Sequence, residues 1–119
     1  MTENPKPYDL EDRSFEFAKH VRSFIKLLPT TLSNVEDAKQ VVRASGSVAS
    51  NYIEANDALS KKDFVMRIKI CRKEAKECVL WLRLLDAHGN VEVAGEQAVL
   101  TQEARELMSI FAAIMRKSE

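Results

Sequence analysis

The feature that most constrains the fold is a run of apolar side chains that repeats with the spacing 4-3-4-3-4-3 in the middle of the chain. Its members are Phe64, Ile68, Cys71, Ala75, Cys78, Leu82 and Leu85. This spacing places all of them on one face of an α-helix over three heptads. Directly before the run, the hydroxyl of Ser60 precedes the carboxylate of Asp63 by three positions, which is typical of a capped helix start. The pattern therefore predicts a long helix that begins near Ser60.

A second apolar stripe follows the same predicted helix. It consists of Met66, Ile70, Leu80, Trp81 and Leu84. A helix on the surface of a single core needs only one apolar stripe. The second stripe indicates that this helix contacts partners on more than one side, so we expect it to take part in self-association.

A first helix is predicted from about residue 9 or 12 to residue 28, because Pro29 cannot continue a helix. The expected helix has Phe15, Ala18, Arg22, Ile25 and Leu28 on one face, with Phe17, Val21 and Phe24 beside them.

A second helix is predicted to begin at Asn34, whose side chain can cap it, while Asp37 occupies the first turn, where the helix dipole favours negative charge. Its expected apolar line is Ala38, Val42, Ser45, Ala49 and Tyr52. Gly46 costs about 1 kcal/mol relative to Ala inside a helix. We therefore expect a packing reason for it, namely the close approach of a neighbouring backbone.

A fourth helix is predicted from about residue 93, after the turn signal at Gly89. Its apolar line repeats with the spacing 4-3-4-3 and consists of Leu100, Ala104, Leu107, Phe111 and Ile114. Four amphipathic helices joined by short connections predict an all-α, antiparallel up-down-up-down four-helix bundle. With 119 residues the chain supports one domain, which we expect to span residues 9–119 after a disordered tail over residues 1–8.

Charge and hydropathy exclude several classes of protein. The chain carries 18 basic and 18 acidic residues, so it lacks the strong overall basicity of non-specific nucleic-acid binders. The longest uncharged run, residues 44–53, is too short to span a membrane, and no secretory signal is visible. We expect a cytoplasmic protein in which Cys71 and Cys78 are reduced core residues.

Charge is nevertheless uneven along the chain. Residues 60–88 contain eight basic and four acidic residues, an excess of +4. The candidate nucleic-acid face consists of Lys61, Lys62, Lys69, Lys73 and Lys76. Lys69, Lys73 and Lys76 repeat with the spacing 4-3, which is also typical of a solvated stripe or of ion pairs between subunits. No row of aromatic side chains accompanies these lysines, although binding of single-stranded nucleic acid would need one.

A polar stripe lies on the predicted second helix, where Arg43, Ser47, Asn51 and Glu54 follow one another with the spacing 4-4-3 and so share a face. Our interpretation is a hydrogen-bonded polar seam between helices or subunits that also involves Glu74 and Glu77 and determines the register of packing. The catalytic alternative pairs Glu54 with one of those two glutamates as general acid and base.

Metal and cofactor sites have little support in the sequence. A di-metal bundle needs inward Glu-x-x-His pairs on two helices. The chain has only His20 and His88; Glu16 is four residues from the first and Asp86 two from the second. Because no phosphate loop or nucleophile motif is present either, we predict no metal, no cofactor and no enzymatic activity.

The central part of the chain carries a family resemblance in residues 43–55 (RASGSVASNYIEA), 60–64 (SKKDF) and 73–85 (KEAKECVLWLRLL). It resembles the bacterial four-helix-bundle family named for proteins encoded in 23S rRNA intervening sequences. The positions that match the pattern are Arg43, Ser47, Asn51, Glu54, Glu74, Glu77 and Trp81. The resemblance implies a protomer that assembles into a homopentameric ring, but it supplies no activity, because members of the family have no agreed biochemical function.

Related bundles serve as accessory proteins of diversity-generating retroelements, in which a basic pentamer engages a reverse transcriptase and nucleic acid. This chain is neutral and departs from that pattern. We therefore predict a non-enzymatic oligomeric scaffold or interaction protein of unknown partner. The alternative is a nucleic-acid-binding accessory factor that uses the basic face of the third helix.

Overall fold

The computed structural model describes residues 9–119, which form four α-helices. They are α1 (Asp9–Ile25), α2 (Leu32–Asn56), α3 (Lys61–Leu84) and α4 (Val91–Ser118). No strand occurs between residues 9 and 119, so the predicted all-α class is confirmed. The expected disordered tail over residues 1–8 lies outside the described residues.

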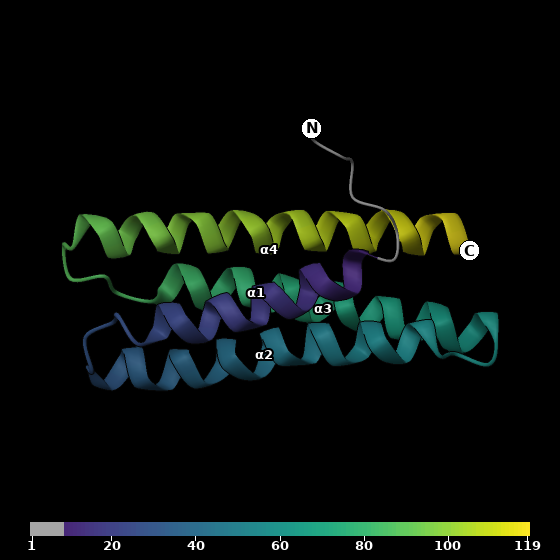
Figure 1. Ribbon diagram of the computed structural model, residues 1–119, viewed down its shortest axis with the longest axis horizontal. Coiled ribbons are helices and arrows are strands. Elements are labelled where there is room, and N and C mark those ends of the chain that lie inside the picture. Colours follow the sequence, from purple (N-terminus) through teal and green to yellow (C-terminus); the bar gives the residue numbers. More distant parts are fainter. Residues whose placement is uncertain (1–8) are drawn as a thin grey trace.

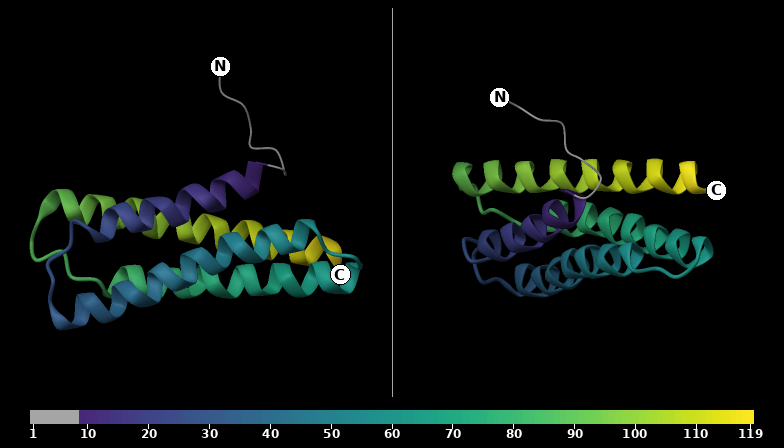
Figure 2. Two further views of the ribbon diagram at one scale, coloured as in Figure 1. Left: turned by 60° about the horizontal axis from the view of Figure 1, so that its bottom comes forward. Right: turned by 45° about the vertical axis from the view of Figure 1, so that its right-hand side comes forward.

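The four helices run alternately in opposite directions and lie side by side (Figures 1 and 2). Each helix packs against the next one in the chain, and α1 also contacts α4, which closes the bundle. The predicted up-down-up-down topology is therefore confirmed. The four pairs are not equivalent, because α1 and α4 are the most loosely packed neighbours. At 17 residues α1 is also much shorter than the 28-residue α4.

Side-chain caps explain where three of the helices begin. The hydroxyl of Ser60 accepts a hydrogen bond from Asp63 N at 3.0 Å, as predicted for α3. The side chain of Asn90 accepts from the backbone N–H groups of Glu92 and Val93, so α4 begins two residues before its predicted start. Each cap satisfies donors that the first turn of a helix leaves without an intrahelical partner.

The sequence predicted that Asn34 caps the start of α2, and this prediction was wrong. Thr31 takes that role, because its hydroxyl accepts from Asn34 N at 3.2 Å, and the helix begins at Leu32. The side chain of Asn34 is buried and bonds instead to the backbone of Pro29 and Asp86. Thr31 and Asn34 are both suitable N-cap residues, and the earlier of the two, Thr31, occupies the N-cap position.

The core face of α1 differs from the predicted one. Phe17, Val21 and Phe24 are almost fully buried, whereas Phe15 is 56% exposed. The residues predicted to lie beside the first face therefore form the core face of α1, together with Ala18, which is buried as well. The helix also ends at Ile25, three residues before its predicted end, and a tighter turn precedes Pro29.

The core line of α2 agrees only in part with the predicted line. Ser45 and Tyr52 are buried as predicted, whereas Val42 and Ala49 are only half-buried. Their neighbours Val41 and Val48 are fully buried instead. The reason for Gly46 also differs from our expectation. A Cβ there would lie 3.3 Å from Nη2 of Arg22, so a side chain of α1, and not a neighbouring backbone, crosses α2 at this point.

The apolar lines predicted for α3 and α4 form most of the core. Their buried members are Ile68, Cys71, Ala75, Cys78, Leu82, Leu85, Leu100, Ala104, Leu107 and Phe111. Phe64 and Ile114 of the same lines are only partly buried and pack against this core. Both cysteines are buried free thiols, in agreement with the sequence. None of the helices in residues 9–119 combines the length and the apolar character needed to cross a lipid bilayer.

The end of α3 is held by a side chain of α4. α3 ends at Leu84, before the Gly89 turn. Nε2 of Gln97 donates to the carbonyl oxygens of Leu82 and Leu85 at 2.7 and 2.8 Å. These carbonyl groups would otherwise lack partners at the helix end, so Gln97 fixes α3 against the start of α4.

Candidate functional site

The first group of predicted site residues lies between α2 and α3. Nη2 of Arg43 is 3.4 Å from Oε1 of Glu74 and 3.3 Å from Oε1 of Glu77. Glu74 is buried, whereas the Arg43 side chain is about half exposed. The arginine thus supplies a counter-charge for a buried carboxylate, and the polar seam at this point lies within one protomer.

The second part of the seam lies further along the same two helices. Nδ2 of Asn51 donates to the carbonyl oxygen and to the hydroxyl of Ser47, at 2.9 and 3.1 Å. Its Oδ1 accepts from Nη1 of Arg67 at 3.0 Å. The sequence interpretation did not include Arg67. The signal was present, because Arg67 precedes Glu74 by seven residues and so lies on the same face of α3.

Glu54 lies outside this network. Its side chain is exposed, and none of the hydrogen bonds within residues 9–119 joins it to Glu74 or Glu77. It is 11 residues beyond Arg43, which corresponds to about 16 Å along α2 at 1.5 Å per residue. The structure therefore does not bring Glu54 together with the two glutamates that the catalytic alternative required.

The five candidate lysines project from the outside of α3. Lys61, Lys62, Lys69, Lys73 and Lys76 are all exposed. None of them takes part in an ion pair within the described part of the chain, because the nearby carboxylates of Glu74 and Glu77 face Arg43. Their positive charge is therefore not neutralised inside the protomer.

Apolar side chains accompany these lysines on the same side of α3. Met66, Leu80 and Leu84 are 46%, 47% and 53% exposed, respectively. We call Met66, Lys69, Lys73, Lys76, Leu80 and Leu84 the α3 outer face. Apolar and charged side chains are thus exposed together on this side of α3.

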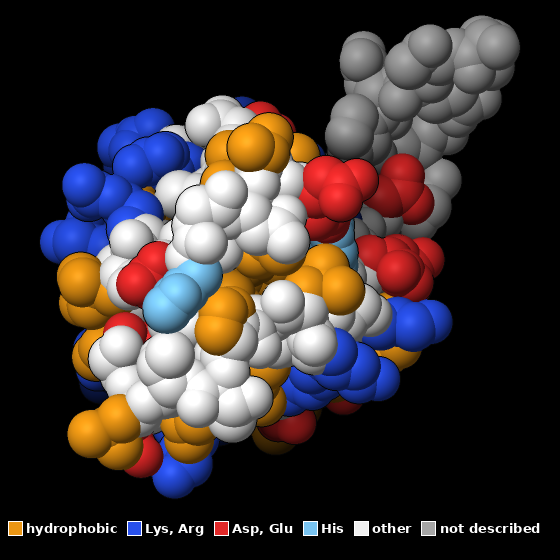
Figure 3. All heavy atoms as spheres, turned by 90° about the vertical axis from the view of Figure 1, so that its left-hand side faces the viewer, with side chains coloured by type: hydrophobic (Ala, Val, Ile, Leu, Met, Phe, Trp, Pro, Cys, Tyr) orange, Lys and Arg blue, Asp and Glu red, His pale blue; other side chains and the backbone are white. Residues whose placement is uncertain are grey.

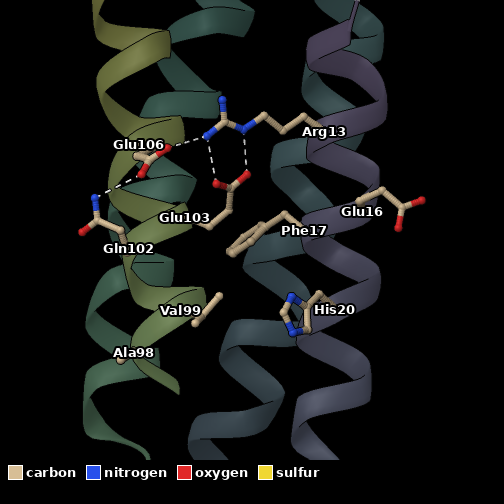
Figure 4. A pocket seen from close by; sticks show the side chains of 9 residues that line it. All are labelled: Arg13, Glu16, Phe17, His20, Ala98, Val99, Gln102, Glu103 and Glu106. Atoms are coloured by element: carbon tan, nitrogen blue, oxygen red, sulfur yellow. Dashed lines mark hydrogen bonds and ion pairs between the residues drawn. The ribbon is translucent and has the colours of Figure 1, made fainter. Parts of the chain in front are cut away.

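A groove that the sequence did not predict lies between α1 and α4 (Figure 4). One part of it has a volume of about 580 Å³, with Phe17 of α1 and Val99 of α4 facing each other across it. Towards the turn after α1 it continues into a second hollow of about 740 Å³, lined by Leu27, Gly95 and Val99 among others. We call the two together the α1–α4 groove.

A charged cluster holds one end of the α1–α4 groove. Nε of Arg13 lies 2.7 Å from Oε2 of Glu103, and Nη2 donates to Oε1 of Glu103 and of Glu106 at 2.9 and 2.8 Å. Hydrogen bonding to Glu103 raises the pKa of the Arg13 guanidinium. Hydrogen bonds from Gln102 and from Arg13 lower the pKa of the Glu106 carboxyl. The cluster joins the two least tightly packed helices of the bundle.

The α1–α4 groove carries more acidic than basic side chains. Its acidic lining consists of Glu16, Glu92, Glu96, Glu103 and Glu106. Arg13 is the one arginine or lysine among the described residues that line it, and Nε2 of His20 lies 2.8 Å from Oε1 of Glu96. In the end-on view of Figure 3 the largest groups of basic and acidic side chains lie on different flanks of the bundle.

Reactive groups are few in this part of the chain. Between residues 9 and 119, no three His, Cys, Asp or Glu side chains are placed so that they could hold a metal ion. Burial raises the pKa of the Cys71 and Cys78 thiols to about 12, so neither is a reactive thiolate near neutral pH. What the geometry offers is a set of surfaces for binding.

The described residues form a small all-α four-helix bundle that exposes apolar and charged side chains on α3. The chain belongs to the 23S rRNA-intervening sequence protein family, whose pattern it matches over residues 7–113. It is also similar to a solved structure from Bacteroides thetaiotaomicron VPI-5482, described as a protein with unknown function from the S23 ribosomal protein family. The TM-score is 0.75 at 28% sequence identity, covering 88% of this chain and 96% of that chain. A comparison with curated proteins gives no match.

Proposed function

We propose that the protein is a non-enzymatic scaffold that assembles as a homo-oligomer, and that the assembled protein binds a protein partner. The observation that carries the proposal is the exposure of Met66, Leu80 and Leu84 on the α3 outer face. Three large apolar side chains on one side of a single helix expose area that a second protein can remove from water, at about 25 cal/mol per Å².

The arrangement of polar groups supports a binding role rather than a catalytic one. The Glu74 and Glu77 carboxylates are engaged by Arg43, and Glu54 lies apart from them. General acid–base catalysis needs two groups that approach the same reacting atoms. The proposal includes the cytoplasmic location expected from the sequence.

The family resemblance makes a homopentameric ring the proposed assembly. Multi-angle light scattering after size-exclusion chromatography measures this directly. We expect a mass five times the protomer mass of 13.5 kDa, stable on dilution to low micromolar concentration. A protomer mass at every concentration up to about 100 μM, well above the dissociation constants of stable complexes, would reject the scaffold.

A second candidate function is nucleic-acid binding by the lysines of α3. It is favoured by the exposure of Lys69, Lys73 and Lys76 without ion-pair partners among residues 9–119. Fluorescence anisotropy with labelled RNA and DNA oligonucleotides tests it, because phosphate-driven affinity falls steeply as salt is raised. No binding at low salt would reject this candidate and leave the scaffold unaffected.

A further inference from the structure

We propose that the α3 outer face of one copy docks into the α1–α4 groove of a second copy, so that the copies associate head to tail. The inference rests on the proposed homo-oligomeric scaffold and names its interface. It commits to a second copy of this chain as the occupant of the groove.

Charge complementarity is the first argument. The α3 outer face carries Lys69, Lys73 and Lys76, which have no acidic partner within the described residues. The α1–α4 groove carries five glutamates, and Arg13 engages two of them, Glu103 and Glu106. Opposite potentials on two faces of the same chain steer copies together and disfavour pairing of like faces.

Apolar complementarity is the second argument. Met66, Leu80 and Leu84 interrupt the lysines on the α3 outer face, and Leu27 and Val99 are exposed in the groove. An added Cβ on the groove residue Gly95 would meet nothing within 4 Å, so the wall of α4 has room for an approaching side chain. Lysine stems also cover apolar surface while their charged ends remain in water.

The topology of the bundle makes the contact intermolecular. α3 packs between α2 and α4, and its backbone does not closely approach that of α1. The α3 outer face therefore belongs to a different side of the molecule from the α1–α4 groove, and one protomer cannot fill its own groove. An interface between two different surfaces of identical copies is heterologous, and repetition of such a contact closes into a ring or extends as a filament.

Charge reversal of each face alone tests the proposal. The α3 reversal is Lys69→Glu/Lys73→Glu/Lys76→Glu, and the groove reversal is Glu16→Lys/Glu92→Lys/Glu96→Lys. Each change opposes like charges across the proposed interface, so we expect light scattering to show loss of the assembly and a protomer mass. The matched control, Lys19→Glu/Lys26→Glu/Lys39→Glu, changes exposed lysines elsewhere and should keep the wild-type mass.

Combining the two reversals in one chain gives the decisive measurement. The acidic α3 face then meets a basic groove, so we expect recovery of the wild-type assembly mass. Circular dichroism of every variant establishes that the helices are formed. A folded combined variant that stays at the protomer mass, or single reversals that keep the full assembly, would overturn the inference.

The same experiment separates this inference from the proposals that precede it. A wild-type chain at the protomer mass rejects the oligomeric scaffold itself. If the wild type and both single-reversal variants all assemble, the oligomeric scaffold stands but its interface lies elsewhere on the protomer. If the α3-reversal variant still assembles but no longer binds an RNA oligonucleotide that the wild type binds, the inference is overturned and the lysines belong to a nucleic-acid surface.

Discussion

Asn34 and Asp86 are joined by two hydrogen bonds across 52 residues of sequence. Nδ2 of Asn34 donates to the carbonyl oxygen of Asp86, and Oδ1 accepts from its backbone N–H, both at 2.9 Å. Nδ2 also donates to the carbonyl oxygen of Pro29 at 3.1 Å. One buried amide thus ties the turn before α2 to the connection after α3.

Replacing this amide should destabilise the bundle. In Asn34→Ala the backbone groups of Asp86 lose their partners, so we expect the free energy of unfolding to fall by about 2–3 kcal/mol. Urea denaturation at one fixed protein concentration measures the change. Gln40→Ala, at an exposed position of α2, is the control. Equal effects of the two substitutions would show that Asn34 does not hold the connections together.

The buried thiols predict a loss of stability at alkaline pH. Burial raises the pKa of Cys71 and of Cys78 from 9.0 to about 12. Between these two values the unfolded chain loses protons that the folded chain retains, so the free energy of unfolding falls as pH rises. From pH 9 to pH 10 the fall should be about 2 kcal/mol larger in the wild type than in Cys71→Ala/Cys78→Ala.

The comparison is made by urea denaturation at pH 8, 9 and 10. Other alkaline groups are shared by the two proteins. Tyr52 cancels only in part, because burial raises its pKa in both proteins but Cys71 adds to that rise in the wild type alone. The double variant is less stable throughout, because it loses buried sulfur, but only the slope with pH is compared. Parallel slopes would contradict the protonated state that burial imposes on the two thiols.

The cluster that joins α1 to α4 should contribute modestly and in a pH-dependent way. Arg13→Ala removes a guanidinium that binds both carboxylate oxygens of Glu103, and we expect a loss of about 1 kcal/mol. The pKa of Glu106 is lowered in the folded chain, so its contribution is present above the ordinary carboxyl pKa and is lost as pH falls through the folded value.

Urea denaturation of wild type and Arg13→Ala between pH 3 and pH 7 checks this prediction. The difference in unfolding free energy should shrink towards acid pH. Arg13→Lys keeps the charge but not the two-pronged hydrogen bonding, so it should restore only part of the difference. A difference that is constant with pH would indicate lost packing rather than a lost ion pair.

The two helical glycines should respond differently to alanine. Gly95→Ala meets open space and should raise the free energy of unfolding by about 1 kcal/mol, the usual helix preference for Ala over Gly. Gly46→Ala places a Cβ 3.3 Å from Nη2 of Arg22, which must move and weaken its contact with the carbonyl oxygen of Val42. We expect a smaller gain, and thermal unfolding of both variants gives the comparison.

The sequence predicted best those elements whose signals are local. The Ser60 cap and the regular line through Ile68 and Leu82 lie within one helix, so α3 and its core face followed directly. On α1 two stripes competed, and the choice depended on which one the rest of the bundle covers. Periodicity alone does not contain that information: the apolar spacing placed Phe15 on one face with Ala18, yet Phe15 is exposed and Ala18 is buried.

The surfaces, like the helices, could be predicted only where their signals are local in the sequence. The spacing of Arg43 and Asn51 indicated a shared polar face, and the structure supplies Glu74 and Arg67 as their partners across α3. The α1–α4 groove could not be predicted, because Arg13 and Glu103 are 90 residues apart in sequence. Their proximity depends on how α1 packs against α4, and no local sequence pattern contains that information.

The loose contact between α1 and α4 also has a consequence for the order of folding. In the described part of the chain α2 packs extensively on α3, and α3 on α4, whereas α1 packs less on both of its neighbours, α2 and α4. We expect α2, α3 and α4 to associate first and α1 to dock last. The same helix should detach first in the native protein, so its amide protons should exchange with solvent faster than those of α3.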